Sequence, residues 1–456
     1  MRFVKFVFSR FFICITLIAA LTAAIIFLCI YIHSLLPAAA AIALAYTLSL
    51  VAAACLLFGN SPSEFRSGWL TLIIIFPVGG AILYFLSCAS RCRKCGCRRL
   101  LPQSTCTSFE YFDDGAKFLD RLITLVSTAK KYVYLEFYII SKGHIWGLLN
   151  KKLTEALARG VEVKIIYDGL GSALRAPKRD FKALKKAGAG IKAFNKLMPF
   201  PVSRLNFRDH RKIAVIDGES VFLGGVNIAD EYANLSSPHG HWKDGGALFF
   251  GRIAAVYRDV FLSAFDDSPI PEEYGGKTEN ITLTPVIDEP EHAGGAYEDF
   301  LAQMLYGAKV RAYIFTPYLC MGEKLGDALS FAAGRGVDVK IIIPHVPDKK
   351  LTYAITRTYC ERLAEKGVQI FTYTPGFMHF KGVVCDDRAL LGSYNFDFRS
   401  MRLNYECAVF GGEELAYALV RDFTATLAVS AKLTVKKRCA AVRTLRSALY
   451  LLAPLV

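Results

Sequence analysis

The sequence has almost no acidic residues at its two ends. Residues 1–100 contain nine basic residues and one acidic residue, and residues 431–456 contain six basic residues and no acidic one. The body between them is nearly neutral, with 40 basic and 39 acidic residues. An enzyme that binds nucleic acid is expected to place its positive charge around the phosphates. The net charge of +15 instead flanks the body, which argues against nucleic acid and favours an anionic lipid surface.

Charged residues are also scarce in the chain as a whole. They make up 21% of the sequence against 53% hydrophobic residues, and the mean hydropathy is +0.33. This composition excludes a disordered chain and is unusual for a wholly soluble protein. Three apolar stretches stand out, at residues 11–32, 36–58 and 69–86, and each approaches the ~20 residues of a spanning helix. We therefore expect a transmembrane region over residues 1–90, with two to three spans.

The first apolar stretch has a second interpretation as a cleaved signal peptide, because three basic residues precede it. It is longer than an ordinary signal core, however, and further apolar stretches follow it. Five basic residues after the last stretch outnumber those three, so the body is expected on the cytoplasmic side of a multi-pass membrane protein. The orientation of the first segment is left open.

Cysteine use indicates a reducing compartment. The chain has 13 cysteines, an odd number, and several lie within the apolar stretches, where a disulfide framework is implausible. A basic segment over residues 91–106 contains Cys92, Cys95, Cys97 and Cys106. These four thiols could hold a tetrahedral zinc ion or remain free, and no second CxxC pair at zinc-finger spacing supports the metal.

The body contains an internal repeat. Arg159–Ile166 matches Arg335–Ile342, 176 residues later, with the pattern Arg-Gly-Val-acidic-Val-Lys-Ile-Ile in both copies. Each copy follows a helical pattern and, before it, another apolar strand: helices at 148–159 and 325–335, strands at 132–140 and 310–317. Strand, helix and strand in this order indicate parallel sheet covered by helices. The predicted fold class is therefore α/β, with two similar halves.

An acidic, proline-rich segment, Asp266–Glu273, separates the halves, which meet at about residue 280. In the last segment, apolar residues at helical spacing stand beside basic ones, so a C-terminal helix could lie in the membrane interface or dock on the protein surface. The predicted organisation is a transmembrane region (1–90), a juxtamembrane segment (91–106), a first half (107–270), a linker (271–280), a second half (281–430) and a basic amphipathic helix (431–456).

One motif, His-x-Lys followed by Asp, occurs once in each half, with a glycine and an asparagine after it. Its residues are His210, Lys212, Asp217 and Asn227 in the first half and His379, Lys381, Asp386 and Asn395 in the second. One copy arises by chance in on the order of a few per cent of chains of this size, so two copies are a much stronger signal. The candidate catalytic set consists of the histidines, lysines and aspartates. Since each aspartate has odd spacing from its histidine, it lies on the opposite strand face and is more typical of a structural hydrogen-bond partner.

The set suits phosphodiester chemistry without a metal or other cofactor. One neutral imidazole would attack phosphorus, and the other, as imidazolium, would protonate the leaving alkoxide. The lysines and asparagines would neutralise the phosphate oxygens. Histidine titrates near neutral pH, so both roles are accessible in the cell. A hairpin after each histidine would return the asparagine to the histidine end of its strand, and the active site is expected between the halves.

These residues resemble the paired motifs of the phospholipase D superfamily, and their surroundings are similar to bacterial cardiolipin synthases. The similarity involves Gly224–Tyr232, Trp242–Asp244, Thr316–Tyr318, Asn395–Ser400 and Asn404–Glu406. The resemblance implies two phospholipase D-like halves, each a mixed β-sheet flanked by helices, at a bacterial plasma membrane. It implies transfer between two phosphatidylglycerol molecules, giving cardiolipin and glycerol through a phosphohistidine. A hydrolase of phospholipid, or less expectedly of nucleic acid, is the alternative, and the oligomeric state is open.

The resemblance also suggests individual roles. His210 is the expected nucleophile and His379 the general acid, although the similarity of the two halves leaves the reverse assignment open. Asp244 and Glu406 are candidates to orient an imidazole, and Ser393 is a candidate to support the phosphate or its ligands.

Two further points concern the neighbourhood of the motifs. Glu136 and Asp168 are acidic at positions where the family also tends to be acidic, but a salt bridge at a strand end explains them equally well. The interval from the motif lysine to the following glycine is twelve residues in the first half and eleven in the second. A slip of one residue would turn Asn395 to the wrong face, so we expect a tighter turn in the second hairpin.

Overall fold

The structure is a computed structural model of the chain, and it describes residues 19–28, 38–59, 63–88, 101, 103–196, 206–271, 274, 280–290 and 295–434. Its described residues fall into two compact units, one within residues 19–88 and one within residues 101–434, and each is described by itself. Cys92, Cys95 and Cys97 lie outside the described residues, whereas Cys106 is buried in a strand. No group of metal-ligating side chains occurs among the described residues.

The first unit consists of apolar helices. Residues 19–28 are helical, and α3 (Ala38–Phe58), α4 (Ser63–Ile75) and α5 (Pro77–Cys88) follow. Helix α3 coincides with the second predicted stretch, and the third stretch is divided between α4 and α5 by a bend before the proline. Within the described ranges, no helix has both the length and the apolar character of a membrane span. The predicted spans stay a prediction.

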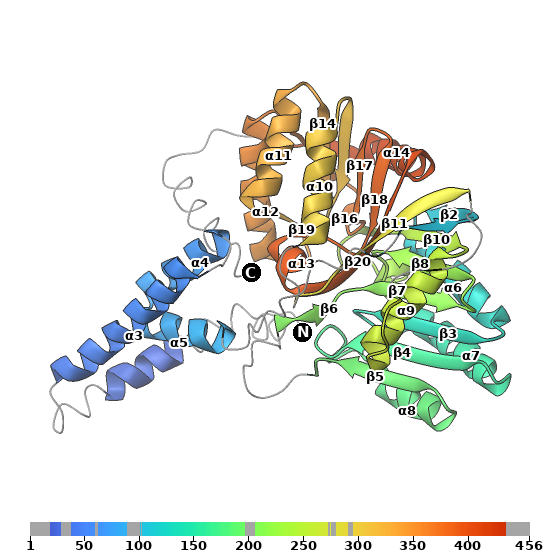
Figure 1. The fold of residues 1–456 in the computed structure, drawn as a ribbon, viewed down its shortest axis with the longest axis horizontal. Helices are drawn as coiled ribbons and strands as arrows, with labels where there is room; N and C mark the ends of the chain where they lie inside the picture. Colours follow the sequence, from blue (N-terminus) through green and yellow to red (C-terminus); the bar gives the residue numbers. More distant parts are fainter. Residues whose placement is uncertain are drawn as a thin grey trace. The chain divides into compact units, whose positions relative to one another are not determined.

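The second unit contains two large mixed sheets (Figure 1). The first sheet has the strand order β2-β10-β8-β7-β3-β4-β5, and helices α6, α7 and α8 pack against one face of it. The strands are β2 (Ser108–Phe112), β3 (Tyr132–Phe137), β4 (Glu162–Asp168), β5 (Gly190–Phe194), β7 (Lys212–Ile216), β8 (Ser220–Gly224) and β10 (Gly246–Phe250), and the helices are α6 (Gly115–Thr128), α7 (His144–Ala158) and α8 (Lys178–Lys186).

The second sheet has the order β1-β11-β20-β18-β17-β12-β14-β15-β21, with α10, α11 and α12 beside it. Its strands are β1 (Ser104–Cys106), β11 (Ile281–Asp288), β12 (Arg311–Phe315), β14 (Asp338–Pro344), β15 (Gln369–Tyr373), β17 (Gly382–Cys385), β18 (Arg388–Gly392), β20 (Asn404–Gly411) and β21 (Ser430–Lys432). The helices are α10 (Ala296–Gly307), α11 (Glu323–Gly334) and α12 (Lys350–Glu365). Strand β1, from the predicted juxtamembrane segment, thus extends the sheet of the second half.

The two sheets repeat one topology. The predicted repeat falls on β4 and β14, which run parallel to β3 and β12, and β3 and β12 in turn pair antiparallel with the first strand of a hairpin, β7 or β17. The α/β class with mixed sheets is therefore confirmed. Of the predicted C-terminal helix, residues 431 and 432 belong to β21, and residues 435–456 lie outside the described part of the chain.

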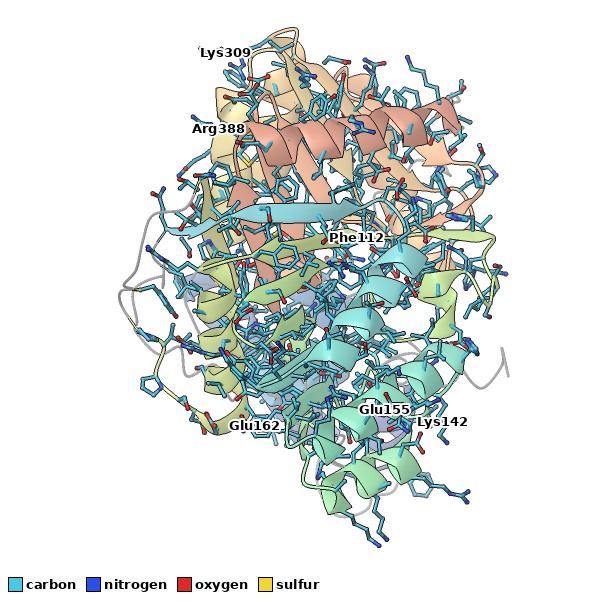
Figure 2. The ribbon with its side chains drawn as sticks, turned by 90° about the vertical axis from the view of Figure 1, so that its right-hand side faces the viewer. Phe112, Lys142, Glu155, Glu162, Lys309 and Arg388 are labelled. Atoms are coloured by element: carbon cyan, nitrogen blue, oxygen red, sulfur yellow. The ribbon has the colours of Figure 1, made fainter. Side chains whose placement is uncertain are left out.

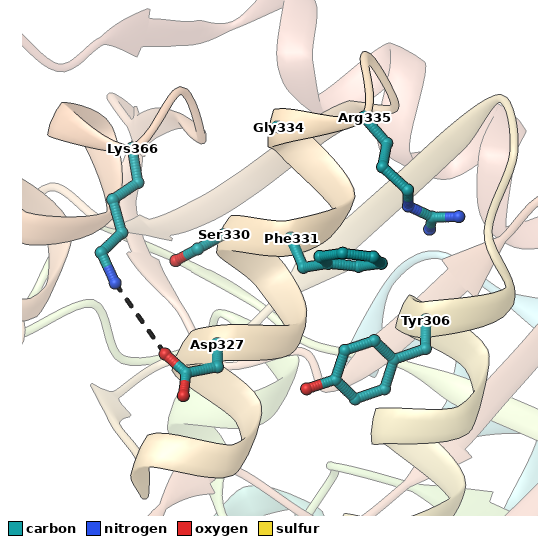
Figure 3. A pocket seen from close by; sticks show the side chains of 7 residues that line it. All are labelled: Tyr306, Asp327, Ser330, Phe331, Gly334, Arg335 and Lys366. Carbon is teal, nitrogen blue, oxygen red and sulfur yellow. Dashed lines mark ion pairs between the residues drawn. The ribbon is translucent and has the colours of Figure 1, made fainter.

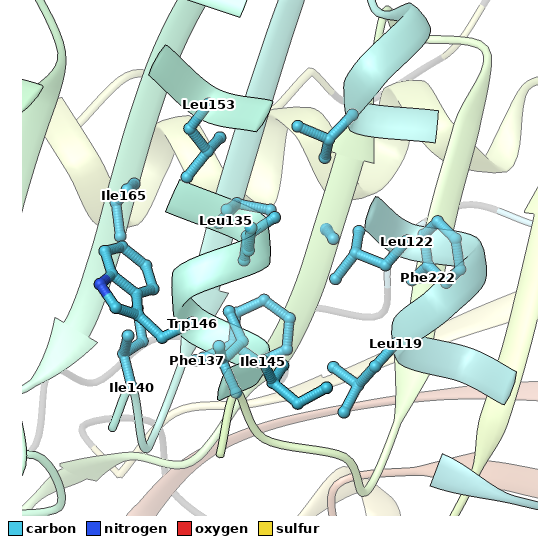
Figure 4. Packing of buried hydrophobic residues seen from close by; sticks show 14 of the residues in the cluster. Leu119, Leu122, Leu135, Phe137, Ile140, Ile145, Trp146, Leu153, Ile165 and Phe222 are labelled. Atoms are coloured by element: carbon cyan, nitrogen blue, oxygen red, sulfur yellow. The ribbon is translucent and has the colours of Figure 1, made fainter. Parts of the chain in front are cut away.

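A hydrophobic core fills the space between the two sheets. It combines side chains of both sheets with those of α9 (Ile253–Asp266) and α14 (Glu413–Ala428). A second core lies under α6 and α7, where Trp146 and Phe137 pack with leucines of both helices (Figure 4). Charged side chains lie on the outside of this unit, as Lys142, Lys309 and Arg388 show (Figure 2). The cores fix the sheets, and the sheets position the motif residues.

The two motif hairpins differ only at their turns. Strands β7 and β8 are joined by three residues between the paired Ile216 and Ser220, whereas β17 and β18 are joined by two residues between the paired Cys385 and Arg388. The register therefore places each motif lysine opposite its glycine in both hairpins. The expected tighter turn is confirmed, since the missing residue is absorbed at the end of the hairpin that is distant from the histidine.

Each turn begins with the motif aspartate in a left-handed backbone conformation, at φ 57° for Asp217 and 54° for Asp386. The Asp217 carboxylate accepts the backbone N–H groups of residues 130, 131 and 132, and Asp386 accepts those of residues 309, 310 and 311. The two aspartates thus join each hairpin to the start of the neighbouring strand, β3 or β12.

Replacement of Asp217 by alanine is expected to lower the free energy of unfolding by ~2 kcal/mol, because three backbone donors lose a charged acceptor and alanine disfavours positive φ. Thermal unfolding of the purified full chain in detergent measures this loss as a lower Tm. The control is Glu219→Ala in the same turn, because Glu219 is exposed and makes only a 3.6 Å ion pair with Lys131. Equal Tm values for the two variants would contradict the structural role of Asp217.

Candidate active site

Short parallel ladders between the halves hold the two motif histidines. Strand β6 (Arg208–Asp209) of the first half pairs with β20 of the second, and His210 N–H then donates to Tyr405 O at 2.9 Å. Strand β16 (Gly376–Met378) of the second half pairs with β9 (His241–Lys243) of the first, and His379 N–H donates to Lys243 O at 2.8 Å. By this register, His210 lies opposite Glu406, which follows Tyr405, and His379 lies opposite Asp244, which follows Lys243.

Those opposite residues are the two predicted carboxylates. His210 Nδ1 lies 2.9 Å from both carboxylate oxygens of Glu406, and His379 Nδ1 lies 2.5 Å from Asp244 Oδ2. The pairing crosses the halves in both cases. The carboxylate at Nδ1 fixes the orientation of each ring, so Nε2 is the nitrogen that would meet a substrate. Nε2 of His379 also lies 3.0 Å from Lys381 Nζ. The sequence predicted these four residues but not which carboxylate faces which imidazole.

The two motif lysines are buried beside the imidazoles. Lys212 Nζ donates to His210 O at 2.5 Å, and Lys381 Nζ donates to His379 O and lies 2.7 Å from Nδ1 of the same ring. Burial lowers the pKa of Lys212 to about 8 and that of Lys381 to about 7, although the carboxylates nearby oppose the shift. Two buried ammonium groups in one site favour the binding of an anion beside them.

The imidazoles are held in their neutral form. Burial lowers the pKa of His210 well below its ordinary value, and the charges of Lys212 and Lys381 lower it further. Burial and the Lys381 charge likewise lower the pKa of His379 to about 3, against the opposing effect of Asp244. The neutral ring is the nucleophilic form. A phosphate between the lysines would offset their charge and raise the pKa of a ring that donates a proton.

The two orienting carboxylates differ in their surroundings. Glu406 accepts hydrogen bonds from Ser393 Oγ and from Asn404 Nδ2, at 3.1 Å for the second, and burial raises its pKa to about 7. Burial also acts to raise the pKa of Asp244, but the interaction with His379 and the charge of Lys381 outweigh it and lower that pKa. Ser393 is therefore placed to hold a carboxylate rather than to face a phosphate.

The two predicted asparagines are not equivalent. Asn227 Oδ1 accepts Ile139 N–H at 3.0 Å, and its Nδ2 donates to Tyr232 Oη at 2.6 Å. The Tyr232 ring in turn packs edge-on against His379, with 5.2 Å between ring centres. Asn395 is buried, and its Oδ1 accepts no hydrogen bond among the described residues. Asn227 thus holds the tyrosine that packs against His379, whereas Oδ1 of Asn395 has no hydrogen-bond partner among the described residues.

The remaining predicted acids lie apart from the imidazoles. Asp217 and Asp386 bind backbone N–H groups at the far end of the motif hairpins. Asp168 lies 3.5 Å from the buried guanidinium of Arg208, and Glu136 lies 3.7 Å from that of Arg211. The salt-bridge explanation fits Asp168. Glu136 makes a 3.7 Å contact with Arg211 but no hydrogen bond among the described residues, and burial raises its pKa well above the ordinary value.

Sequence reasoning gave no individual role to several residues around the imidazoles, although Trp242 belongs to a segment on which the family resemblance rests. The ring of Tyr138 packs edge-on against His210 at 5.1 Å between centres, and Trp242 lies at 5.2 Å from His379. Arg211 directly follows the first motif histidine, Arg208 lies two residues before it, and both are buried. Arg211 also pairs with Glu289 at 2.9 Å. Basic and aromatic residues are common throughout the chain, so most of these residues could not be recognised as site residues. Only the basic residues beside His210 could have been recognised, from their position next to the motif.

An open surface pocket elsewhere in the second half has no comparable chemistry. It lies against α10 and α11, and its charged groups are already engaged (Figure 3). Lys366 lies 3.9 Å from Asp327, and Arg335 stacks on Phe331 and donates to a backbone carbonyl at the end of α10. The two imidazoles with their lysines and carboxylates are therefore the candidate active site.

Comparison with known proteins agrees with this geometry. A family model described as "Cardiolipin synthase, PLD-like domain" matches residues 122–237 and 301–427, and one described as "Phospholipase_D-nuclease N-terminal" matches residues 47–87. The chain is similar to the major cardiolipin synthase ClsA of Bacillus subtilis, with 34% identity over 342 residues that cover 72% of this chain and 70% of the relative. A cardiolipin synthase of Oceanobacillus iheyensis is 33% identical over 337 residues, with 72% and 70% covered.

Among solved structures, the crystal structure of phosphatidylserine synthase from Haemophilus influenzae is similar in fold. The TM-score is 0.63 at 15% identity, and the match covers 78% of this chain and 98% of that one. The likeness at this identity concerns the fold alone. The family match spans both halves and more than half of the chain, and the curated relatives exceed 30% identity. The chain therefore belongs to the cardiolipin synthase family of phospholipase D-like proteins.

Proposed function

We propose that the chain is a phosphatidyltransferase that converts two molecules of phosphatidylglycerol into cardiolipin and glycerol. The observation that supports it most directly is the pair of imidazoles, each oriented by a carboxylate of the other half and each beside a buried lysine. This arrangement suits attack on a phosphodiester by one ring and proton donation by the other. Membership of the cardiolipin synthase family supports the choice of substrate.

In the first half-reaction, His210 Nε2 attacks the phosphorus of phosphatidylglycerol. A P–N bond forms, and the bond from phosphorus to the headgroup oxygen breaks. His379, protonated once the phosphate anion has entered, gives its proton to that oxygen, and glycerol leaves. Lys212 and Lys381 stabilise the negative oxygens in the transition state. The phosphatidyl group remains on His210.

In the second half-reaction, a headgroup hydroxyl of another phosphatidylglycerol attacks the same phosphorus. His379 accepts the hydroxyl proton, the P–N bond breaks, and cardiolipin is released with His210 restored. Water at this step would give phosphatidic acid instead, which is the product of a hydrolase on the same fold. The choice between the two therefore depends on the acceptor that reaches the phosphohistidine.

We further propose that residues 1–90 lie in a bacterial plasma membrane as a multi-pass region and that the catalytic body is cytoplasmic. The helices of this region expose large apolar side chains, among them Leu44, Leu50, Phe58 and Ile74, each more than two-thirds exposed. Apolar surface of this extent is costly in water and favourable in lipid. The basic residues that follow the last apolar stretch favour the cytoplasmic side.

Membranes that contain the chain are washed with alkaline carbonate and dissolved in detergent. They are then given labelled phosphatidylglycerol without added divalent metal, and they are expected to form labelled cardiolipin and free glycerol. The lipid products are separated by chromatography, and membranes without the chain are the control. Phosphatidic acid as the only product would contradict transfer. Loss of the protein to the carbonate wash would contradict its embedding in the membrane.

His210→Ala is expected to abolish the labelled covalent enzyme formed from phosphatidylglycerol labelled in its phosphate, because no ring nitrogen is then placed to attack phosphorus. Acid-quenched protein is separated from lipid, and its label is counted. Label that persists in this variant would overturn the choice of nucleophile.

The matched control is His379→Ala, which removes the other imidazole and leaves the proposed nucleophile. With phosphatidylglycerol it is expected to lower the rate of labelling by ~10²-fold or more, because the alkoxide then leaves without a proton. With phosphatidyl-p-nitrophenol, whose leaving group needs no proton, most of that loss is expected to disappear. Equal losses with the two substrates would contradict His379 as the general acid.

The pH profile of kcat/KM is expected to fall above about pH 7 and more steeply above about pH 8. Burial lowers the pKa of Lys381 to about 7 and of Lys212 to about 8, so the ammonium forms are present below these values and are lost as pH rises. Since bound phosphate favours the ammonium form, kcat is expected to persist to higher pH than kcat/KM. Initial rates across pH 5–10 measure both, and a flat kcat/KM through that range would contradict the requirement for charged lysines.

A further inference from the structure

The proposed reaction brings two phosphates to one site. The reacting phosphorus is bound to His210, and the acceptor phosphatidylglycerol has its own phosphodiester, separated from the attacking hydroxyl by one glycerol unit. Lys212 and Lys381 contact the motif histidines and are committed to the reacting phosphate. The second anion needs a cation of its own, at a short distance from His210.

Two cations outside the motifs lie near that imidazole. Arg399 Nη2 donates to Asn206 O, four residues before His210 in the chain. Burial and the motif lysines lower the pKa of His210, and the charges of Arg399 and Lys349 lower it further. Neither residue has a carboxylate within ion-pair distance among the residues that the structure describes. Unpaired cations near a buried site are the groups that an anionic ligand would engage.

Arg399 is held in position by its own helix. Strand β19 (Phe396–Asp397) leads into α13 (Phe398–Arg402), which begins with the Asp397 carboxylate accepting Ser400 N–H at 2.7 Å. Arg399 is half-buried, and its Nη2 donates to Asn206 O at 2.7 Å. Burial lowers its pKa, while the side chains of Tyr138 and Asp397 act in the opposite direction. Tyr138 is the residue whose ring contacts His210.

Lys349 approaches the same region from the start of α12. It is exposed, and its Nζ lies 5.2 Å from the centre of the Tyr318 ring, whose hydroxyl donates to Asp348 at 2.6 Å. Strand β13 (Leu319–Cys320), directly after Tyr318, pairs in parallel with β19. This ladder brings the Tyr318 and Lys349 side chains next to the segment that leads to Arg399.

We propose that Arg399 and Lys349 form a second anion site, which binds the phosphodiester of the acceptor phosphatidylglycerol while its hydroxyl attacks the phosphohistidine. The proposal rests on the proposed transfer reaction. In that step the acceptor oxygen forms a bond to phosphorus, the P–N bond breaks, and the acceptor proton goes to His379. Arg399 and Lys349 take no proton; they select an anionic lipid over water or a neutral alcohol as the acceptor.

Competition between acceptors tests the proposal. Wild type, Arg399→Gln and Lys349→Gln are given labelled phosphatidylglycerol in micelles with ethanol, and the ratio of cardiolipin to phosphatidylethanol is measured. The ratio is expected to fall about tenfold in Arg399→Gln, because a charge-assisted contact to the acceptor is lost, and about threefold in the more exposed Lys349→Gln. Lys350→Gln, the adjacent exposed lysine, is the matched control with an unchanged ratio.

The outcomes separate this proposal from the proposed function. Wild type that forms no cardiolipin would overturn the transfer reaction itself. Wild type that forms cardiolipin, with an unchanged ratio in both variants, would overturn only the second anion site. A parallel fall of both products would also overturn it, because that result indicates a general effect on folding or on membrane contact. Lys349→Gln keeps the test valid if Arg399→Gln fails to fold.

Discussion

The hydrogen bonds between each motif imidazole and a carboxylate of the opposite half are the interaction on which the site depends. His210 belongs to the first half and is oriented by Glu406 of the second, while His379 belongs to the second and is oriented by Asp244 of the first. The ladders β6–β20 and β16–β9 set both pairs in register. Neither half therefore contains a complete imidazole–carboxylate pair, and the core between the sheets is a condition for chemistry as well as for stability.

A second constraint follows from the charge that these contacts bury. Lys212 and Lys381 are placed in a low-dielectric site where their pKa values fall, and burial together with the lysine charges keeps the imidazoles neutral. A phosphodiester is the ligand that offsets this positive charge, so the empty site and the occupied site differ in which groups hold protons. The protonation needed for leaving-group departure is thus coupled to substrate binding.

Much of the catalytic body was predictable from the sequence. Hydrophobic periodicity and the repeat around Arg159 and Arg335 gave the parallel strands, and the motif spacing gave the hairpins, including the tighter second turn. The crossed carboxylate pairs were not predictable, because they depend on ladders of two or three residues between segments far apart in the chain. The positions of Arg208 and Arg211 beside His210 were visible in the sequence, but their burial was not predictable, since local sequence does not tell a buried basic residue from an exposed one.

Strand β1 has a consequence for how the chain can be divided. Ser104–Cys106 precedes the first half in sequence, yet it pairs along β11 and covers the outer edge of the second half's sheet. A fragment that begins after residue 106 would leave the outward backbone N–H and C=O groups of Ile281–Leu283 in β11 without their partners. Such an open edge is a template for pairing between molecules, so a catalytic fragment that keeps residues 104–106 retains its protection against self-association.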